Sequence, residues 1–150
     1  MLKITKLSKL PSQALVEQLY EIHLNTLPQQ DQMTKQNFFD EFYLSPNRVY
    51  LVATNSDEVV GYLGALDIID DYNIVGIALK NNYQRRGVGT KLLSSLVKLA
   101  KNHQVQTISL EVDEKNEKEI NFYKKNGFEL TNIRKNYYKD NDALIMWLYL

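Results

Sequence analysis

One loop carries residues whose types and spacing suit a bound anion: it reads Tyr83-Gln84-Arg85-Arg86-Gly87-Val88-Gly89-Thr90. Its two glycines lack a Cβ, so backbone amides can approach a ligand closely. An apolar run precedes the loop and an amphipathic run follows it, which predicts a strand, a turn and a helix. The free N–H groups and the dipole of the helix's first turn favour negative charge, and the two arginines can add charge-assisted hydrogen bonds. The pattern predicts a pyrophosphate-binding loop; the alternative is a strand-to-helix turn with solvated arginines.

Glu111 is a candidate general base. In the run 107–112, apolar residues alternate with polar ones, so Ser109 and Glu111 share one face of the expected strand. A strand between two crossover helices should lie inside the sheet, where its carboxylate would be partly buried. Burial raises the pKa of a carboxylate and makes it a better proton acceptor at neutral pH. The alternative is an ordinary polar residue at the end of a strand.

Tyr123 and Asn116 are candidates for two further roles. Tyr123 follows Phe122 in an expected helix, so the two rings cannot both point straight into one core. A tyrosine that faces a cleft can donate its phenolic proton to a departing thiolate; otherwise it is an amphipathic core residue. Asn116 precedes the same helix, where it can either cap the helix or contact a ligand.

The elements that must position these residues follow from periodicity. Strands are expected over residues 1–7, 49–54, 59–69, 72–79, 107–112, 128–133 and 143–148, and helices over 91–103 and 118–126, the latter closed by Gly127. Two earlier helices are expected after the caps Ser12 and Thr34. The order β-α-α-β-β-β-α-β-α-β-β predicts a mixed α/β fold, in which helices flank a central sheet that is partly antiparallel and partly parallel.

Composition limits the classes of protein to consider. The 150 residues suit a single domain spanning 1–150. The formal net charge is zero, which gives no electrostatic footprint for nucleic acid or a membrane surface, and no apolar run is long enough to span a bilayer. Cysteine is absent, which excludes disulfides and a covalent cysteine intermediate, and with only His23 and His103 no metal site is expected. The N-terminus reads as a strand and not as a signal peptide, so a cytoplasmic protein is expected.

The glycine loop fits neither of two common phosphate-binding fingerprints, because the third glycine of G-x-G-x-x-G and the Gly-Lys-Ser/Thr of a Walker loop are missing. It resembles instead the Gln/Arg-x-x-Gly-x-Gly/Ala loop of the GCN5-related N-acetyltransferases (GNATs). In that family the loop holds the pyrophosphate of acetyl-coenzyme A.

The stretch from 72 to 146 is similar to one GNAT subfamily, the bacterial ribosomal-protein-alanine N-acetyltransferases. The similarity is carried by Leu110-Glu111-Val112 with Asn116, Phe122-Tyr123-Lys124-Lys125-Asn126-Gly127-Phe128, Ile133-Arg134-Lys135-Asn136-Tyr137-Tyr138 and Asp142-Ala143-Leu144-Ile145-Met146. The chain departs from the subfamily at Leu27-Pro28-Gln29-Gln30, where Pro-Trp is typical, and at Gly76, where Asn is usual. Both departures concern substrate contacts.

This resemblance implies the GNAT fold and the roles of individual residues. By position, Glu111 matches the general base, Tyr123 the general acid, and Tyr138 a residue that grips the substrate backbone. The matching acetyl-coenzyme A contacts are Ile77, Ala78, Leu79, Arg85, Arg86, Gly87, Val88, Gly89, Thr90 and Asn116. The implied reaction is direct transfer of an acetyl group from acetyl-coenzyme A to the α-amine of a protein N-terminus. For this subfamily the acceptor is the N-terminal alanine of a small ribosomal-subunit protein, and the enzyme is expected to be a monomer or a homodimer.

Other functions stay open on the sequence alone. A small-molecule amine, such as a polyamine or an amino sugar, requires the same chemistry with a different acceptor. A non-catalytic acetyl-coenzyme A-binding module would keep the loop and lose Glu111 and Tyr123, which are both present. A protein-interaction domain with Tyr137 and Tyr138 in its binding face would leave the glycine loop unexplained. Presenting a free amine at pH 7 costs roughly 1 kcal/mol for an α-amine and more than about 4 kcal/mol for lysine, which favours an N-terminal acceptor.

Overall fold

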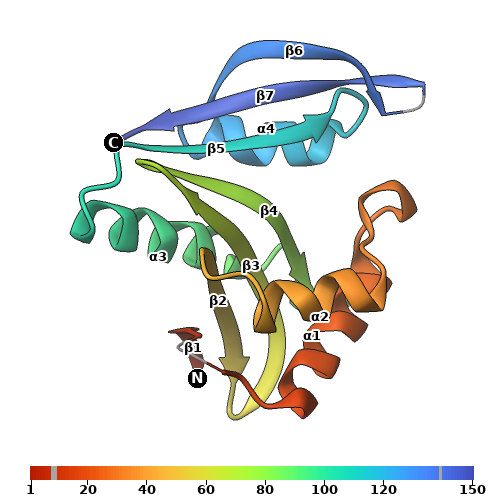
Figure 1. Cartoon of the computed structure of the whole chain (residues 1–150), viewed down its shortest axis with the longest axis vertical. Helices are drawn as coiled ribbons and strands as arrows, with labels where there is room; N and C mark the ends of the chain where they lie inside the picture. The colour runs from red at the N-terminus through yellow and green to blue at the C-terminus, as the bar shows by residue number, and fades with distance from the viewer. Residues whose placement is uncertain (8–9, 139) are drawn as a thin grey trace.

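The computed structural model describes residues 1–7, 10–138 and 140–150 (Figure 1). In chain order, its elements are β1 (Leu2–Lys6), α1 (Gln13–Thr26), the 3₁₀ turn η1 (Gln29–Asp31), α2 (Lys35–Tyr43), β2 (Arg48–Asn55), β3 (Glu58–Ile68), β4 (Asp71–Leu79), the 3₁₀ turn η2 (Asn81–Tyr83), α3 (Val88–Asn102), β5 (Thr107–Asp113), α4 (Glu117–Lys125), β6 (Glu129–Tyr138) and β7 (Asn141–Tyr149). The predicted order of helices and strands is confirmed. The sequence does not predict η1 and η2, because three-residue polar turns carry no periodic pattern.

The strands form one mixed sheet, as predicted. Its order is β1-β2-β3-β4-β5-β7-β6. Neighbouring strands are antiparallel except β4 and β5, which are parallel because the crossover through α3 returns the chain to the end of the sheet at which β4 begins. The strand that carries Glu111, β5, therefore lies inside the sheet, between β4 and β7.

Side-chain alternation divides the core into two layers on opposite faces of the sheet. In β2, Val49, Leu51 and Ala53 join a cluster that includes the apolar residues of α3 and α4. Tyr50 and Val52, which alternate with them, join a second cluster with α1 and α2. The glycine loop and α4 thus belong to one layer, and the segment that follows α1 belongs to the other.

The sheet opens between β4 and β5. The two strands pair only over residues 71–74 and 107–110, and from there β4 continues to Leu79 paired with β3 alone. In Figure 1, β5, β7 and β6 accordingly turn away from β2, β3 and β4. No strand pairs with Ile77, Ala78 and Leu79 on the β5 side, so a ligand can reach the main chain of β4 there.

Candidate active site

One cavity of about 660 Å³ lies beside the unpaired end of β4. Its wall comes from four segments: the end of α1 with the turn that follows, the end of β4, the glycine loop with the first turn of α3, and α4. The lining residues are Thr26, Leu27, Pro28, Ile77, Ala78, Leu79, Gln84, Arg85, Gly87, Gly89, Thr90, Asn116, Lys118, Glu119, Phe122, Tyr123 and Lys125. Both layers of the fold therefore contribute to a single site.

The glycine loop presents backbone N–H groups at the edge of this cavity. Arg85 and Gly87 have left-handed backbones, with φ of 60° and 81°, which turn the chain into α3. A Cβ on Gly87 would meet no atom within 4 Å, so backbone conformation and not crowding favours glycine there. The side chains of Ser12, Thr34 and Asn116 cap α1, α2 and α4, whereas no side chain caps α3. The first-turn N–H groups of α3 are thus available to an anion, and the site fits a pyrophosphate.

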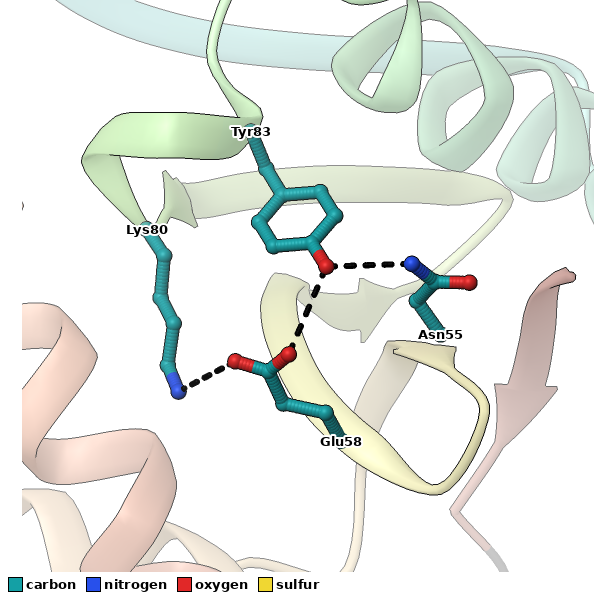
Figure 2. A network of polar contacts seen from close by, with 4 residues as sticks. All are labelled: Asn55, Glu58, Lys80 and Tyr83. Atoms are coloured by element: carbon teal, nitrogen blue, oxygen red, sulfur yellow. Dashed lines mark hydrogen bonds and ion pairs between the residues drawn. The ribbon is translucent and has the colours of Figure 1, made fainter.

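A network of polar contacts holds the segment that leads into the glycine loop (Figure 2). The Tyr83 hydroxyl, at the end of η2, accepts a 3.0 Å hydrogen bond from Asn55 Nδ2 and donates one of 3.3 Å to Glu58 Oε1. Lys80 Nζ lies 3.2 Å from the other oxygen of Glu58. The Arg86 guanidinium stacks 5.2 Å above the Tyr83 ring. The segment that enters the glycine loop is therefore tied to the turn between β2 and β3.

The structure brings together most of the residues expected to contact acetyl-coenzyme A. Those in the cavity wall are Ile77, Ala78, Leu79, Arg85, Gly87, Gly89, Thr90 and Asn116. Arg86 and Val88 are placed elsewhere. Arg86 Nη1 donates to the carbonyl oxygen of Asn82 at 3.1 Å, and the Val88 side chain is buried in the core. Val88 is the first residue of α3, so its backbone N–H still belongs to the uncapped turn.

Tyr123 both packs in the core and lines the cavity. Its ring is 2% exposed and makes edge contacts with Phe122 and Phe128, at centroid distances of 5.2 and 5.3 Å. Its hydroxyl makes no hydrogen bond to any residue that the structure describes, which leaves it free for a ligand. Burial, reinforced by the charge of Glu119, raises the pKa of this phenol well above its usual value. The phenol is therefore protonated and can act as a proton donor.

Glu111 lies on β5, outside the cavity wall. Its side chain is 27% exposed, and Oε1 lies 3.3 Å from Arg134 Nη1 on the edge strand β6. The second oxygen, Oε2, is buried and accepts no hydrogen bond from the described parts of the chain. The Arg134 guanidinium in turn stacks 4.9 Å above the ring of Tyr137. One oxygen of Glu111 is thus held by Arg134, and the other is buried without a hydrogen-bond partner among the described residues.

Tyr138 belongs to a group of side chains that links η1 to the far strands of the sheet. Burial, together with the negative charge of the nearby Asp31, raises the pKa of its phenol. The neighbouring Gln30 donates from Nε2 to Asp113 Oδ2, at the end of β5. Asn141 Nδ2, on β7, donates to the same oxygen at 3.1 Å. We call these five residues the strap; it lies beside the cavity wall and contributes none of the lining residues.

Comparison with known proteins identifies the family. The sequence profile of the Acetyltransferase (GNAT) family matches residues 16–128, which include the glycine loop and Tyr123. The chain belongs to the GNAT acetyltransferase family. It is 37% identical over 135 residues to a Bacillus subtilis protein proposed to be a ribosomal protein bS18-alanine N-acetyltransferase, covering 89% of this chain and 88% of that protein. The predicted family and enzyme class are confirmed.

Two solved structures extend the comparison of this acetyltransferase. The crystal structure of the ribosomal-protein-S18-alanine N-acetyltransferase from Escherichia coli superposes with a TM-score of 0.87 at 25% identity, covering 99% of this chain and 94% of that one. A Bacillus anthracis protein proposed to be a streptothricin acetyltransferase superposes with a TM-score of 0.68 at 24% identity, over 75% of this chain and 68% of that one. That structure is a complex with acetyl coenzyme A, so a protein of this fold binds the ligand that the glycine loop predicts.

Glu119 is a cavity residue of this acetyltransferase that sequence reasoning misses. Its Oε2 accepts a 2.6 Å hydrogen bond from Asn116 Nδ2. Burial, reinforced by the charge of Asp31, raises the pKa of Glu119 to about 7. Its spacing carries a usable signal: Glu119 stands three residues after Asn116 and four before Tyr123, so the three share one helix face.

Within residues 1–7, 10–138 and 140–150, no group of His, Asp and Glu side chains is arranged to hold a metal ion. None of the helices in this part of the chain is long and apolar enough to cross a membrane.

Proposed function

We propose that this acetyltransferase transfers the acetyl group of acetyl-coenzyme A to the α-amine of a protein N-terminus, and that the acceptor is an N-terminal alanine of the ribosomal protein bS18 type. One observation carries the assignment of acetyl transfer: a single cavity joins the uncapped first turn of α3 to the unbonded hydroxyl of Tyr123. The names of the Bacillus subtilis and Escherichia coli relatives support the acceptor.

The residues of the cavity suit acetyl-coenzyme A as the second substrate. The backbone of the glycine loop, with the Arg85 side chain, would hold the pyrophosphate. The main chain of Ile77, Ala78 and Leu79 lacks a partner strand on the β5 side and would offer hydrogen bonds along β4. When bound, acetyl-coenzyme A supplies the acetyl group as an activated thioester. The chain's residues then have to orient that thioester, remove protons from the acceptor amine and protonate the sulfur.

Two side chains take the proton-transfer roles. Glu111, whose side chain is partly exposed, removes a proton from the acceptor amine through a water molecule. Tyr123 donates its phenolic proton to the sulfur as the acetyl group is transferred. The raised pKa of Tyr123 keeps that proton in place until the thiolate develops. A group of this kind typically contributes about 10²–10⁴-fold to a rate.

The acceptor side of the cavity is formed by the segment that departs from the subfamily pattern. Leu27 and Pro28 line the cavity where Pro-Trp is typical. The Cβ of a residue at Gly76 would meet only Leu27, at 3.8 Å, so a larger side chain at this position would reach Leu27 first. We assign to Tyr138, which lies near Asp31 in the strap, the role of binding the peptide backbone. We place the enzyme in the cytoplasm because its acceptor would be a ribosomal protein. We propose that it acts as a monomer or a homodimer.

Mass spectrometry of acetyl transfer tests the proposal. The purified protein and acetyl-coenzyme A would be incubated with short peptides that have Ala, Ser, Met or Gly N-termini. A parallel set of incubations would contain free amines such as spermidine and amino sugars. We expect one acetyl group on the α-amine of the alanine peptides and none on the free amines. Acetylated free amines with unmodified peptides would replace the acceptor by a small molecule. The absence of product in both panels would contradict an N-terminal acceptor altogether.

A further inference from the structure

Among the described residues, Glu119 is the one carboxylate in the cavity wall. It shares the cavity-lining face of α4 with Asn116 and Tyr123, which stand about one turn away on either side. Glu111, by contrast, lies outside the wall and is paired with Arg134. The carboxylate that shares a cavity with the phenolic proton donor is therefore Glu119.

The surroundings of Glu119 leave it able to exchange a proton near neutral pH. Asp31 on η1 faces it as a negative charge, and Tyr123 on its own helix interacts with its charge. Its one direct partner is Asn116, and no lysine or arginine of the described chain forms an ion pair with it. Burial and Asp31 raise the pKa of Glu119 to about 7, although the Asn116 hydrogen bond opposes the rise. The other charged residues of the wall are Arg85, Lys118 and Lys125.

We propose that Glu119 accepts the proton that the acceptor ammonium loses on becoming a free amine, and passes it through a water molecule in the cavity to Tyr123 after Tyr123 has protonated the departing sulfur. The proposal rests on the proposed function, because it assigns a step within acetyl transfer to an amine. Glu119 is then a catalytic residue in its own right, alongside Glu111. It also explains why a partly buried carboxylate without an ion-pair partner shares the cavity wall with the phenol.

The protons and bonds balance over one turnover. A nitrogen–carbon bond forms and the carbon–sulfur bond breaks, while the acceptor nitrogen loses two protons. Glu119 takes the first proton, and Glu111 takes the second through its water and releases it to solvent. Tyr123 gives its proton to the sulfur and regains one from Glu119. One proton is released in total, and the three side chains end in their starting states.

This role favours an α-amine as the acceptor. Glu119, with a pKa of about 7, is nearly matched to an α-ammonium, whose pKa is about 7.7–8.0. Proton transfer from the ammonium to Glu119 is therefore unfavourable by only about tenfold. For a lysine ammonium, with a pKa of about 10.4, the same transfer is unfavourable by more than about 10³-fold. Glu119 therefore adds selectivity for N-terminal amines over lysine side chains.

The variant E119Q tests this role, because glutamine keeps an oxygen to accept the Asn116 hydrogen bond. The kcat/KM would be measured from pH 5.5 to 9 with the best acceptor of the mass-spectrometric panels, and the acetyl-coenzyme A Kd by calorimetry. At pH 8 we expect kcat/KM to fall by about 10²-fold or more, with a Kd within about threefold of wild type. Wild-type kcat/KM should also decrease only below about pH 7, whereas that of E119Q, which depends on acceptor that is already a free amine, should decrease below about pH 8. E117Q, in the exposed first turn of the same helix, is the matched control and should behave as wild type.

A second measurement needs no acceptor. Carboxyl ¹³C NMR titration of the free protein should show a glutamate signal with a midpoint near pH 7, which is absent in E119Q and present in E111Q. A Glu119 midpoint below pH 5 overturns the proposal, as does an E119Q variant with the wild-type pH dependence. A loss of activity matched by an equal loss of acetyl-coenzyme A affinity would make Glu119 a binding residue only. If wild type acetylates free amines and not peptides, the N-terminal acceptor fails while the titration still decides the role of Glu119.

Discussion

Gly87→Ala should weaken both the fold and the pyrophosphate loop, because Gly87 has a φ of 81°. A left-handed backbone costs an L-residue about 1–2 kcal/mol, and the reduced freedom of the unfolded chain returns about 0.4–1 kcal/mol of this. No atom lies within 4 Å of the added Cβ, so no steric clash is added. The expected net loss is about 1 kcal/mol of unfolding free energy, or about 2–4 °C in Tm for a domain of this size. If the loop relaxes instead, its N–H groups move and the Kd for coenzyme A rises.

Urea denaturation and calorimetric titration with coenzyme A measure the two consequences separately. Gly89→Ala is the matched control, because Gly89 is helical and an added Cβ would lie 3.5 Å from the Phe122 ring, which is an ordinary contact. The free energy of unfolding of Gly89→Ala should lie within about 0.5 kcal/mol of the wild-type value or above it. Gly87→Asn should recover part of the loss, since asparagine tolerates the left-handed region. Wild-type stability and coenzyme A affinity in Gly87→Ala would refute the reasoning from backbone conformation.

Three further predictions concern side chains. Tyr123→Phe should slow acetyl transfer by about 10²–10⁴-fold in single-turnover mass spectrometry while the acetyl-coenzyme A Kd stays near wild type; an effect under about threefold would leave Tyr123 as a core residue. Tyr83→Phe removes the hydroxyl bonded to Asn55 and Glu58, so the coenzyme A Kd should rise by about 2–10-fold with kcat unchanged; an unaltered Kd would mean that the network does not position the loop. Burial lowers the pKa of His23 from 6.5 to about 4, so the unfolded chain takes up this proton first as the pH falls. Stability should therefore drop between pH 6.5 and 4, by about 2 kcal/mol from pH 7 to 5 in urea denaturation, and His23→Gln should lack this decrease.

The features that follow a repeating pattern could be predicted from the sequence. Alternation in β2 and β5, the caps Ser12 and Thr34, and the glycines before α3 each specify a local backbone, and the order of elements followed from them. The strap could not be predicted, because Gln30 and Asp31 form a three-residue turn whose partners lie more than eighty residues away in the sequence.

Side-chain direction was the other part that the sequence could not supply. Two adjacent arginines in the loop are equivalent by type, but Arg85 faces the cavity while Arg86 stacks on Tyr83. Glu111 was expected from strand position, and the structure pairs it with Arg134 on the edge strand, a contact that depends on the register of β6 and β7. Spacing alone places Glu119 on the face of Tyr123, yet only the fold shows that this face lines a cavity.

The short pairing between β4 and β5 leaves the two halves of the sheet joined by strand pairing at one end only. Strands β1 to β4 and strands β5 to β7 are joined by backbone pairing over residues 71–74 and 107–110 at one end. Across the open end, the Gln30 side chain on η1 donates a hydrogen bond to Asp113 Oδ2 at the end of β5. Hydrogen bonds to charged groups of this kind contribute about 1.5–3 kcal/mol each. Breaking the Gln30–Asp113 contact therefore costs less than separating the paired strands, and we expect a peptide to enter beside it while both half-sheets stay folded.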